Sequence, residues 1–269
     1  MPCSLWATCP ARPERGDLTR ERNALVTGGA RRIGRSIALA LAADGWSVAL
    51  HHRSAPEEAA AVVKEIEAMG GRAAALNADL AEADAPAGLI ARAAASIGPL
   101  SLLVNNASLF ERDETDSMTA ESWAAHMDIN LRAPAFLSQG FAAQLPEGVE
   151  GNIVNIVDQR VWAPTPHFFS YTISKMALWD MTQVMARSLA PRIRVNAIGP
   201  GPTLPNSRQS PGDFERQSRA TILGRGTTPD EICAAIRFIL ASPAMTGQMI
   251  ALDGGQHLAW ETPDTAIPE

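Results

Sequence analysis

Short apolar runs alternate with longer amphipathic stretches along most of this chain. The runs are rich in Ala, Val, Ile and Leu and lack a polar face, so each predicts a strand that is buried on both sides. Strands are expected at residues 23–27, 47–51, 72–76, 100–104, 151–157, 193–198 and 248–252. Helices are expected between them, at residues 35–44, 56–69, 83–97, 120–145, 171–190 and 229–240.

This alternation predicts the α/β class, as a Rossmann-type, doubly wound parallel sheet with helices on both faces. The chain shows neither an internal repeat nor a second core, so residues 23–260 are expected to form a single nucleotide-binding catalytic domain. The helix at 120–145 should be irregular before Pro134. Residues 202–225 are polar and contain Pro and Gly, which is typical of a mobile lid over a ligand.

The composition and net charge of the chain limit which binding partners are expected. The chain has 269 residues, 46% of them hydrophobic, and a net charge of −6, which argues against nucleic acid or an anionic membrane. Cys3, Cys9 and Cys233 form no cluster, so no metal site is predicted and a reducing, cytoplasmic location is expected. Residues 1–22 are expected to be a disordered extension and residues 261–269 a tail.

A Gly-rich turn separates the first expected strand from the first expected helix, with the sequence Gly28-Gly29-Ala30-Arg31-Arg32-Ile33-Gly34. Free backbone N–H groups and the helix dipole make such a turn a cradle for phosphates. Glycine also lets the backbone approach a ligand closely. In this position, the turn predicts a dinucleotide site.

The second strand predicts which dinucleotide is bound. NAD sites usually place an acid here for the ribose hydroxyls, but this chain has none before Glu57. Arg53 and Ser54, with Arg31 or Arg32, would instead suit the 2′-phosphate of NADPH; the alternative is a solvated strand end. His51 and His52 lack metal-binding partners and are expected to be structural.

Asp79 follows the third expected strand. From this position its carboxylate can either accept from an adenine amino group or cap the next helix.

Tyr171 and Lys175 stand four residues apart at the start of the helix expected at 171–190. Positions four apart share a helix face, so the phenol and the ammonium point into the same space. The ammonium is expected to lower the pKa of Tyr171 from about 10 towards working pH, which suits proton transfer in carbonyl or imine chemistry. The same spacing is also typical of plain neighbours on a helix, and the rest of the chain decides between the two.

These motifs together resemble the short-chain dehydrogenase/reductase family over residues 23–258. The resemblance rests on the Gly-rich turn, Asn105-Asn106-Ala107, Asn130, Tyr171 with Lys175, and Gly199-Pro200-Gly201. It implies seven parallel strands, a homotetramer or dimer, and hydride transfer from a nicotinamide. It also implies that Asn130 supports Lys175 through water. The implied cofactor site comprises Gly28, Arg31, Arg32, Ile33, Gly34, His52, Arg53, Ser54, Asp79, Leu80, Asn105, Ala107, Tyr171, Lys175, Pro200 and Gly201.

Two departures point to one branch of the family. Arg32 stands where the family usually has Gly, and Asp158, just after the strand at 151–157, stands where it usually has a catalytic Ser. Both match the pteridine reductases and dihydromonapterin reductases. The same branch resembles this chain at His52-Arg53-Ser54, at Ser108 with Phe110, and at residues 252–258.

A carboxylate at position 158 changes the chemistry of the site compared with a serine hydroxyl. A hydroxyl donates to a substrate carbonyl, whereas a carboxylate only accepts. Asp158 would also raise the pKa of Tyr171, against Lys175, and the two would titrate as a coupled pair. Such a site suits a flat substrate with amino and ring N–H donors, lying between Phe110 and the nicotinamide.

Arg32 and Ser108 are further candidates for substrate contacts. The alternatives are that Arg32 only binds phosphate, that Ser108 only satisfies backbone, and that Phe110 is ordinary core. The predicted substrate-binding set is therefore Arg32, Ser108, Phe110, Asp158 and Tyr171, and the predicted catalytic set is Asp158, Tyr171, Lys175 and Asn130.

The leading functional hypothesis is an NADPH-dependent oxidoreductase that reduces a pterin of the dihydromonapterin, dihydrobiopterin or dihydrofolate type. One alternative is a family member that acts on another carbonyl, imine or alcohol. Another is a non-catalytic NADP-binding sensor, although a sensor needs no titrating phenol. A small-molecule substrate is expected, with neither nucleic acid nor membrane as a partner.

Overall fold

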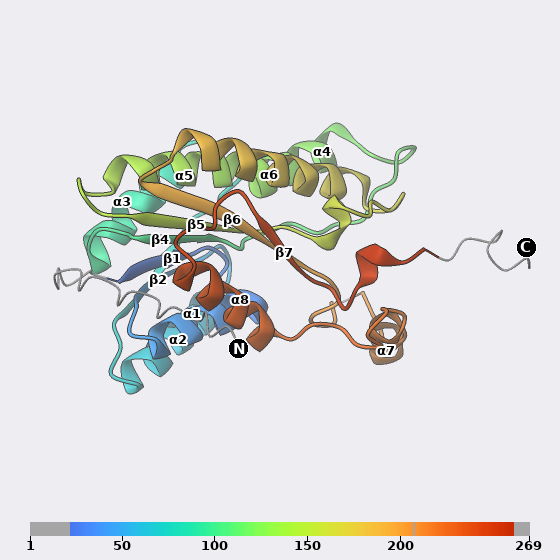
Figure 1. Ribbon diagram of the computed structural model, residues 1–269, viewed down its shortest axis with the longest axis horizontal. Helices are drawn as coiled ribbons and strands as arrows, with labels where there is room; N and C mark the ends of the chain where they lie inside the picture. Colours follow the sequence, from blue (N-terminus) through green and yellow to red (C-terminus); the bar gives the residue numbers. More distant parts are fainter. Residues whose placement is uncertain (1–21, 207, 261–269) are drawn as a thin grey trace, which may run out of the picture.

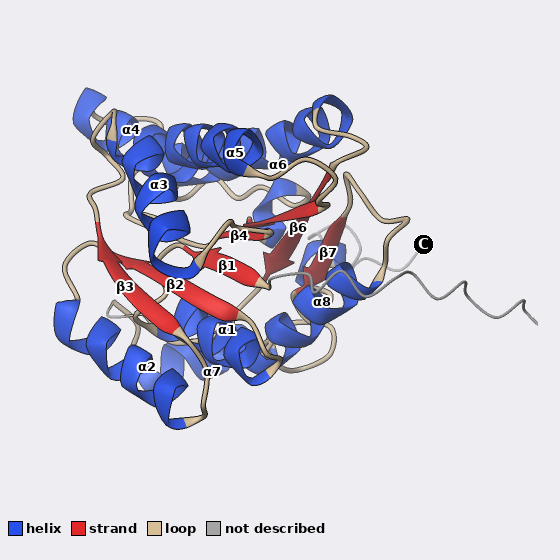
Figure 2. Cartoon of the chain, turned by 90° about the vertical axis from the view of Figure 1, so that its left-hand side faces the viewer, coloured by secondary structure: helices blue, strands red, loops and turns tan. Residues whose placement is uncertain are grey.

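A computed structural model describes residues 22–206 and 208–260 of the chain. Its centre is one seven-stranded parallel sheet with helices on both faces, as the sequence predicts (Figure 2). The predicted tail at 261–269 and the predicted extension at 1–22, apart from Arg22, lie outside the described residues. The strands are β1 (Asn23–Val26), β2 (Ser47–His52), β3 (Ala73–Asn77), β4 (Leu102–Asn105), β5 (Gly151–Ile156), β6 (Ile193–Pro200) and β7 (Met249–Leu252).

The strand order is β3-β2-β1-β4-β5-β6-β7. The chain therefore starts in the middle, runs to one edge, and returns to build the other half from β4. Val26 of β1 pairs with Leu50 of β2 on one side and with Val104 of β4 on the other. This reversal of direction leaves a crevice at the carboxyl ends of β1 and β4, where such sheets bind ligands.

Neighbouring residues of each strand supply opposite faces of the sheet. On β1, Val26 packs with α1 (Arg32–Ala43), α2 (Pro56–Ala68) and α8 (Pro229–Ala241), whereas Leu25 packs with α3 (Ala85–Ile97) and α5 (Ala133–Gln144). Both side chains are fully buried. Figure 1 shows these two helical layers, with α4 (Ala120–Met127) and α6 (Phe169–Ser188) on the side of α3 and α5. The double burial explains the continuous apolar runs in the sequence.

The expected irregularity before Pro134 is a π-helical turn at Asp128–Arg132, between α4 and α5. Asn130, which is fully buried, lies in this widened turn.

The segment predicted as a lid contains a helix that the sequence pattern does not predict, α7 (Pro211–Arg219). It stands apart from both helical layers in Figure 1. The helix is polar on most sides and begins with a capping box, in which Ser210 Oγ accepts from Asp213 N at 3.2 Å and Asp213 Oδ2 accepts from Ser210 N at 3.1 Å. A capping box marks the start of a helix without any apolar periodicity, so α7 cannot be predicted from the pattern of hydrophobic residues.

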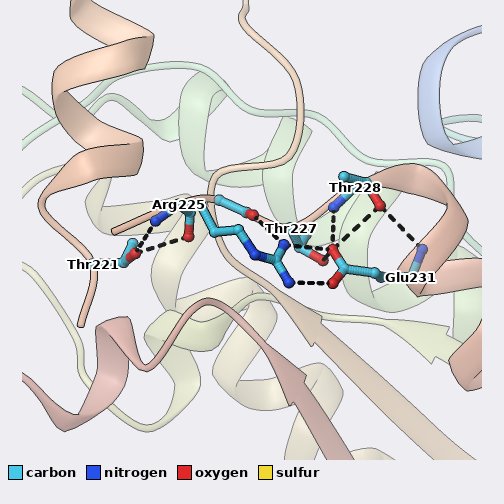
Figure 3. A network of polar contacts seen from close by, with 6 residues as sticks. Thr221, Arg225, Thr227, Thr228 and Glu231 are labelled. Carbon is cyan, nitrogen blue, oxygen red and sulfur yellow. Dashed lines mark hydrogen bonds and ion pairs between the residues drawn. The ribbon is translucent and has the colours of Figure 1, made fainter. Parts of the chain in front are cut away.

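A polar network anchors the far end of the lid to α8 (Figure 3). The Arg225 guanidinium donates to both carboxylate oxygens of Glu231, at 2.6 and 3.0 Å, and Thr228 N donates to the same carboxylate at 2.8 Å. The hydrogen bonds from Arg225 hold the pKa of Glu231 at about 2, although partial burial opposes them. The C-terminal end of the lid is therefore held against α8 by these hydrogen bonds.

Within the described part of the chain, none of the helices combines the length and apolar character needed to span a bilayer.

Candidate active site

Two cavities open at the carboxyl edge of the sheet. The first, of about 270 Å³, lies between the ends of β5 and β6 and the lid, and the second, of about 230 Å³, lies at the ends of β1 and β2. The first contains the predicted residues Arg32, Ile33, Ser108, Phe110, Asp158, Tyr171, Lys175, Pro200 and Gly201. The second contains Gly28, Arg31, His52, Arg53, Ser54, Asp79, Leu80, Ala107 and Ser108. Predicted residues from widely separated stretches therefore meet in two adjoining spaces.

Asp158 and Tyr171 are directly hydrogen-bonded in the first cavity. Tyr171 lies in the first turn of α6 and is 6% exposed, and its hydroxyl donates to Asp158 Oδ2 at 2.8 Å. Asp158 precedes a short 3₁₀ turn, where its Oδ1 accepts from Arg160 N at 2.9 Å. Both carboxylate oxygens are thus oriented, one by the backbone and one by the phenol.

The pKa of Tyr171 is raised well above its usual value. Burial is the largest cause, followed by the charge of Asp158 and the hydrogen bond to it, whereas Arg160 acts in the opposite direction. The expectation that Lys175 lowers this pKa towards working pH is therefore wrong, because burial and, after it, Asp158 raise the pKa. Lys175 Nζ lies 5.9 Å from the Tyr171 ring centroid and donates to Ile156 O at 2.8 Å. Burial lowers the pKa of Lys175 itself to about 8.

Phe110 already belongs to an aromatic cluster. Its ring stacks on Phe168, with centroids 4.3 Å apart and an angle of 13° between the planes, and meets Tyr171 edge-on at 4.6 Å. Phe168 has a left-handed backbone, with φ of 59°, immediately before α6. A flat ligand that stacks on Phe110 must therefore take the place of one of the groups now against that ring.

A buried polar cluster next to Tyr171 is absent from the sequence prediction. Ser170 N donates to Asp113 Oδ1 at 3.0 Å, and Ser170 Oγ donates to Asp113 Oδ2. His126 Nδ1 lies 2.7 Å from Ser170 Oγ, and His126 Nε2 accepts from Glu111 N at 3.1 Å. Because Nε2 accepts, Nδ1 carries the proton of the neutral ring. The cluster ties the Phe110 segment to the start of α6; its one sequence signal is Ser170, directly before Tyr171.

Asn130 also holds the Phe110 segment in place. Its Oδ1 accepts from Leu109 N at 2.8 Å and from Ser108 Oγ at 3.2 Å. Its Nδ2 donates to Leu109 O and to Ser174 Oγ, both at 3.0 Å. The side chain is therefore fully engaged, and the water link from Asn130 to Lys175 stays a prediction.

Backbone conformation and close packing require glycine at two positions of the Gly-rich turn. Gly28 has φ of +63°, and a Cβ on Gly34 would lie 2.1 Å from Gly28 O. Asn106 Nδ2 donates to Thr27 O at 2.8 Å, and Asn105 Nδ2 donates to Asn155 Oδ1 at 2.8 Å inside the sheet. These contacts fix the cradle at the start of α1, whereas Asn105 itself faces β5.

The arginines of the Gly-rich turn have protein partners in this structure. Arg32 has φ of 54°, a conformation natural for the Gly that the family usually carries, and its guanidinium donates to Pro205 O at 2.6 Å and Leu204 O at 3.1 Å. It thus bridges the turn to the lid. Arg31 pairs with Glu58, and Arg53 is exposed at the rim of the second cavity.

His51 is structural, as expected. Its Nδ1 accepts from Gly28 N at 3.1 Å, its Nε2 donates to Ala78 O at 3.0 Å, and burial lowers its pKa to about 4, so the ring is neutral. His52 Nδ1 is buried and has no hydrogen-bond partner within the described part of the chain. Asp79 accepts from Ala81 N at 2.9 Å, but the residue before α3 is Asp84, so the alternative in which Asp79 caps that helix is wrong.

Comparison with known proteins agrees with this architecture. The family model for short chain dehydrogenases matches residues 22–215. FolM alternative dihydrofolate reductase 1 from Brucella canis, crystallised with NADP, is 49% identical and has a TM-score of 0.88, with 90% of this chain and 96% of that chain covered. A metagenomic blue fluorescent protein in complex with NADPH is 33% identical with a TM-score of 0.81, with 87% of this chain and 97% of that chain covered.

Curated relatives include enzymes of another name. A 3-oxoacyl-[acyl-carrier-protein] reductase of Staphylococcus aureus is 32% identical over 242 residues, which cover 88% of this chain and 98% of the relative. The likeness to the FolM structures confirms the resemblance to the pteridine reductase branch. The chain therefore belongs to the short-chain dehydrogenase/reductase family of nicotinamide-dependent oxidoreductases.

Proposed function

We propose that this protein is an NADPH-dependent reductase of pterins of the dihydromonapterin, dihydrobiopterin or dihydrofolate type. The observation that carries the proposal is the hydrogen bond from Tyr171 Oη to Asp158 Oδ2, which puts a carboxylate where relatives of the ordinary type keep a hydroxyl donor. The 49% identity to FolM alternative dihydrofolate reductase 1 supports the same substrate class.

The second cavity and the cradle fit a phosphorylated dinucleotide. Gly28 has φ of +63° and a Cβ on Gly34 would meet Gly28 O at 2.1 Å, so this turn requires glycine at both positions. Arg53 and Ser54 stand at the rim, and His52 Nδ1 is left without a partner among the described residues. Arg31, Arg53 and Ser54 would hold the 2′-phosphate, and Lys175 would hold the nicotinamide ribose. When bound, the cofactor supplies the hydride for the reduction.

Tyr171 acts as the proton donor in this proposal. Its raised pKa keeps the phenol protonated across the working pH range, so the proton is available for a ring nitrogen of the substrate. Asp158 accepts from the amino and ring N–H groups that a pterin presents, because a carboxylate has no proton to donate to a carbonyl. Lys175 supplies positive charge that limits the cost of negative charge left on the phenol.

Turnover of a substrate panel tests the proposal. NADPH oxidation should occur with 7,8-dihydromonapterin, 7,8-dihydrobiopterin or 7,8-dihydrofolate, and not with an acetoacetyl thioester, the substrate type suggested by the oxoacyl reductase relatives. A protein that reduces the thioester and none of the dihydropterins would contradict the proposal.

The charge at Arg53 should select the cofactor. Arg53→Ala should raise the Kd of NADPH by about 10- to 100-fold, the value of one or two charge-assisted hydrogen bonds, and change the Kd of NADH by less than about twofold. Fluorescence titration of both cofactors measures the effect. Equal losses for NADPH and NADH would remove the argument for phosphate selectivity.

The affinity for NADPH should fall as the pH rises through about 8, the pKa of Lys175. Below this pH the ammonium is present in the free enzyme. Above it, binding of the anionic cofactor must first take up a proton, so each further pH unit costs up to about tenfold in Kd. Titrations at pH 7, 8 and 9 measure how the Kd of NADPH depends on pH. The variant Lys175→Met should bind NADPH weakly, and its Kd should not change with pH over this window. A constant wild-type Kd over this window would contradict the role of Lys175.

We also propose that residues 23–260 act as one catalytic domain in a cytoplasmic homotetramer or dimer. Exposed apolar side chains on α5, α6 and α8, at Phe136, Val184 and Phe238, support association. Light scattering of the purified protein distinguishes these states from a monomer.

A further inference from the structure

The catalytic cavity contains a cation with a buried donor that, among the described residues, has no acceptor. Among the described residues that surround it, Arg32, Lys175 and Arg160 are basic and Asp158 alone is acidic. Arg32 donates to two lid carbonyls and Lys175 donates to a carbonyl of β5. Arg160 differs, because its Nη1 atom is buried and has no hydrogen-bond partner among the described residues.

Arg160 is held by the aromatic cluster. It follows Asp158 by two residues, and its guanidinium carbon lies 5.5 Å from the Phe110 ring centroid and 5.0 Å from that of Phe168. Contact with aromatic faces orients a guanidinium but leaves its in-plane N–H donors free. The two oxygens of Asp158 accept from the Tyr171 hydroxyl and from the Arg160 backbone N–H. Among the described residues, neither oxygen accepts from Nη1 of the Arg160 guanidinium.

Neither the cofactor nor the proton transfer needs this charge. Arg160 borders only the first cavity, whereas the residues fitted to the 2′-phosphate border the second. The lid side of the first cavity adds neutral amides, at Asn206, Gln209 and Gln217. A guanidinium N–H group that is buried without an acceptor is costly, and a full negative charge that hydrogen-bonds to it compensates this cost better than a neutral oxygen.

We propose that Arg160 is a specificity-determining residue that binds an anionic group, a carboxylate or a phosphate, on the side chain of the pterin substrate. This inference rests on the proposed function and names the class of pterin that the site prefers. The ring enters beside Phe110, Asp158 meets its N–H groups, and the anion on the side chain reaches Arg160 beside Phe110 and Phe168. A neutral pterin leaves Arg160 unpaired.

Steady-state kinetics with three probes test the inference. 6-Hydroxymethyl-7,8-dihydropterin is neutral, its diphosphate adds only a phosphate anion, and 7,8-dihydrofolate adds carboxylates. In wild-type protein, at least one anionic probe should exceed the neutral one in kcat/KM by about tenfold or more. The two anionic arms show whether phosphate or carboxylate is preferred.

The variant Arg160→Met should remove this preference. We expect kcat/KM for the preferred anionic probe to fall by about 10- to 100-fold, mainly through KM, while the value for the neutral probe changes by less than about threefold. Arg160→Lys should restore part of the loss, because it keeps the charge without the planar fork. Arg112→Gln removes an arginine outside the cavity that pairs with Glu114, and should leave all three values unchanged.

Equilibrium binding separates this inference from the proposed function. Folate, 6-hydroxymethylpterin and its diphosphate are titrated against the NADP⁺ complex of each protein by tryptophan fluorescence, because this complex has no hydride to transfer to them. Equal losses for the neutral and the anionic ligands in Arg160→Met, or no loss for either anionic ligand, would overturn the role of Arg160 even if dihydropterins are reduced. Absence of all dihydropterin turnover would instead overturn the proposed function itself.

Discussion

Replacement of Tyr171 by Phe should lower turnover of a dihydropterin by about 10²- to 10⁴-fold, the usual contribution of a positioned general acid. The hydroxyl is 2.8 Å from Asp158, and because the residue is only 6% exposed, bulk water has little access to it. The pKa of Tyr171 is raised by burial and by Asp158, and the phenol therefore holds its proton until the reaction takes it. Single-turnover oxidation of bound NADPH measures the chemical step directly.

The ring of Phe has the shape of the Tyr ring, so the variant should bind NADPH with an unchanged Kd. A matched control is Ser138→Ala, which also deletes one buried hydroxyl, a donor to Pro134 O at 2.7 Å inside α5 and away from both cavities. That variant should keep full turnover. Turnover of Tyr171→Phe equal to that of Ser138→Ala would show that the phenol is not the acid.

The fold was accessible from sequence because each central strand is buried on two faces. Leu25 and Val26 pack against opposite helical layers, so both positions must be apolar. A strand of this kind therefore appears in the sequence as a continuous apolar run. The same sheet architecture predicts that Asp158, Tyr171 and Lys175 lie close together. Asp158 follows a strand, Tyr171 and Lys175 begin a helix, and strand ends and helix starts meet at one edge of a parallel sheet.

Other parts of the site depend on contacts that sequence spacing does not encode. Arg32 reaches carbonyls of the lid 172 and 173 positions away, and its bonds are known only once the lid is placed. Helix α7 begins at a capping box rather than an apolar stripe. The raised pKa of Tyr171 depends on how deeply the ring is buried, which outweighs the charge four residues along the helix.

The buried polar cluster around Ser170 illustrates the same limit. Asp113 and Ser170 are 57 positions apart, and neither the loop before α4 nor the residues before Tyr171 show a recognisable motif for their pairing. The tertiary fold brings a carboxylate to the N-terminus of α6, where free N–H groups and the helix dipole favour a negative charge. Local sequence reasoning identifies the tyrosine but not the group that fixes its helix.

Replacement of Asp158 by Asn should lower kcat/KM for dihydropterins by at least about 100-fold, because two charge-assisted hydrogen bonds to the substrate are lost and an amide donor is turned towards substrate donors. The side chain keeps its shape, so the 3₁₀ turn at Gln159–Val161 should persist, capped by the amide oxygen in place of Oδ1. NADPH affinity should remain within about twofold, since Asp158 borders only the first cavity. Retention of dihydropterin turnover in this variant would contradict the proposed contact.

The same substitution should move the titration of the phenol, and the sequence allows this to be seen directly because Tyr171 is the only tyrosine in the chain. In wild-type protein the charge of Asp158 and its hydrogen bond both raise the pKa of Tyr171, so tyrosinate absorbance should appear only above the pH at which an ordinary tyrosine ionises, about 10. In Asp158→Asn the repulsion is gone, and the absorbance should appear at lower pH than in wild-type protein, with burial alone holding the pKa up. Tyr171→Phe, which has no tyrosine, supplies the blank for the six tryptophans. Identical titrations of wild-type and Asp158→Asn protein would show that the carboxylate does not act on the phenol, and the pterin assignment would lose its physical basis.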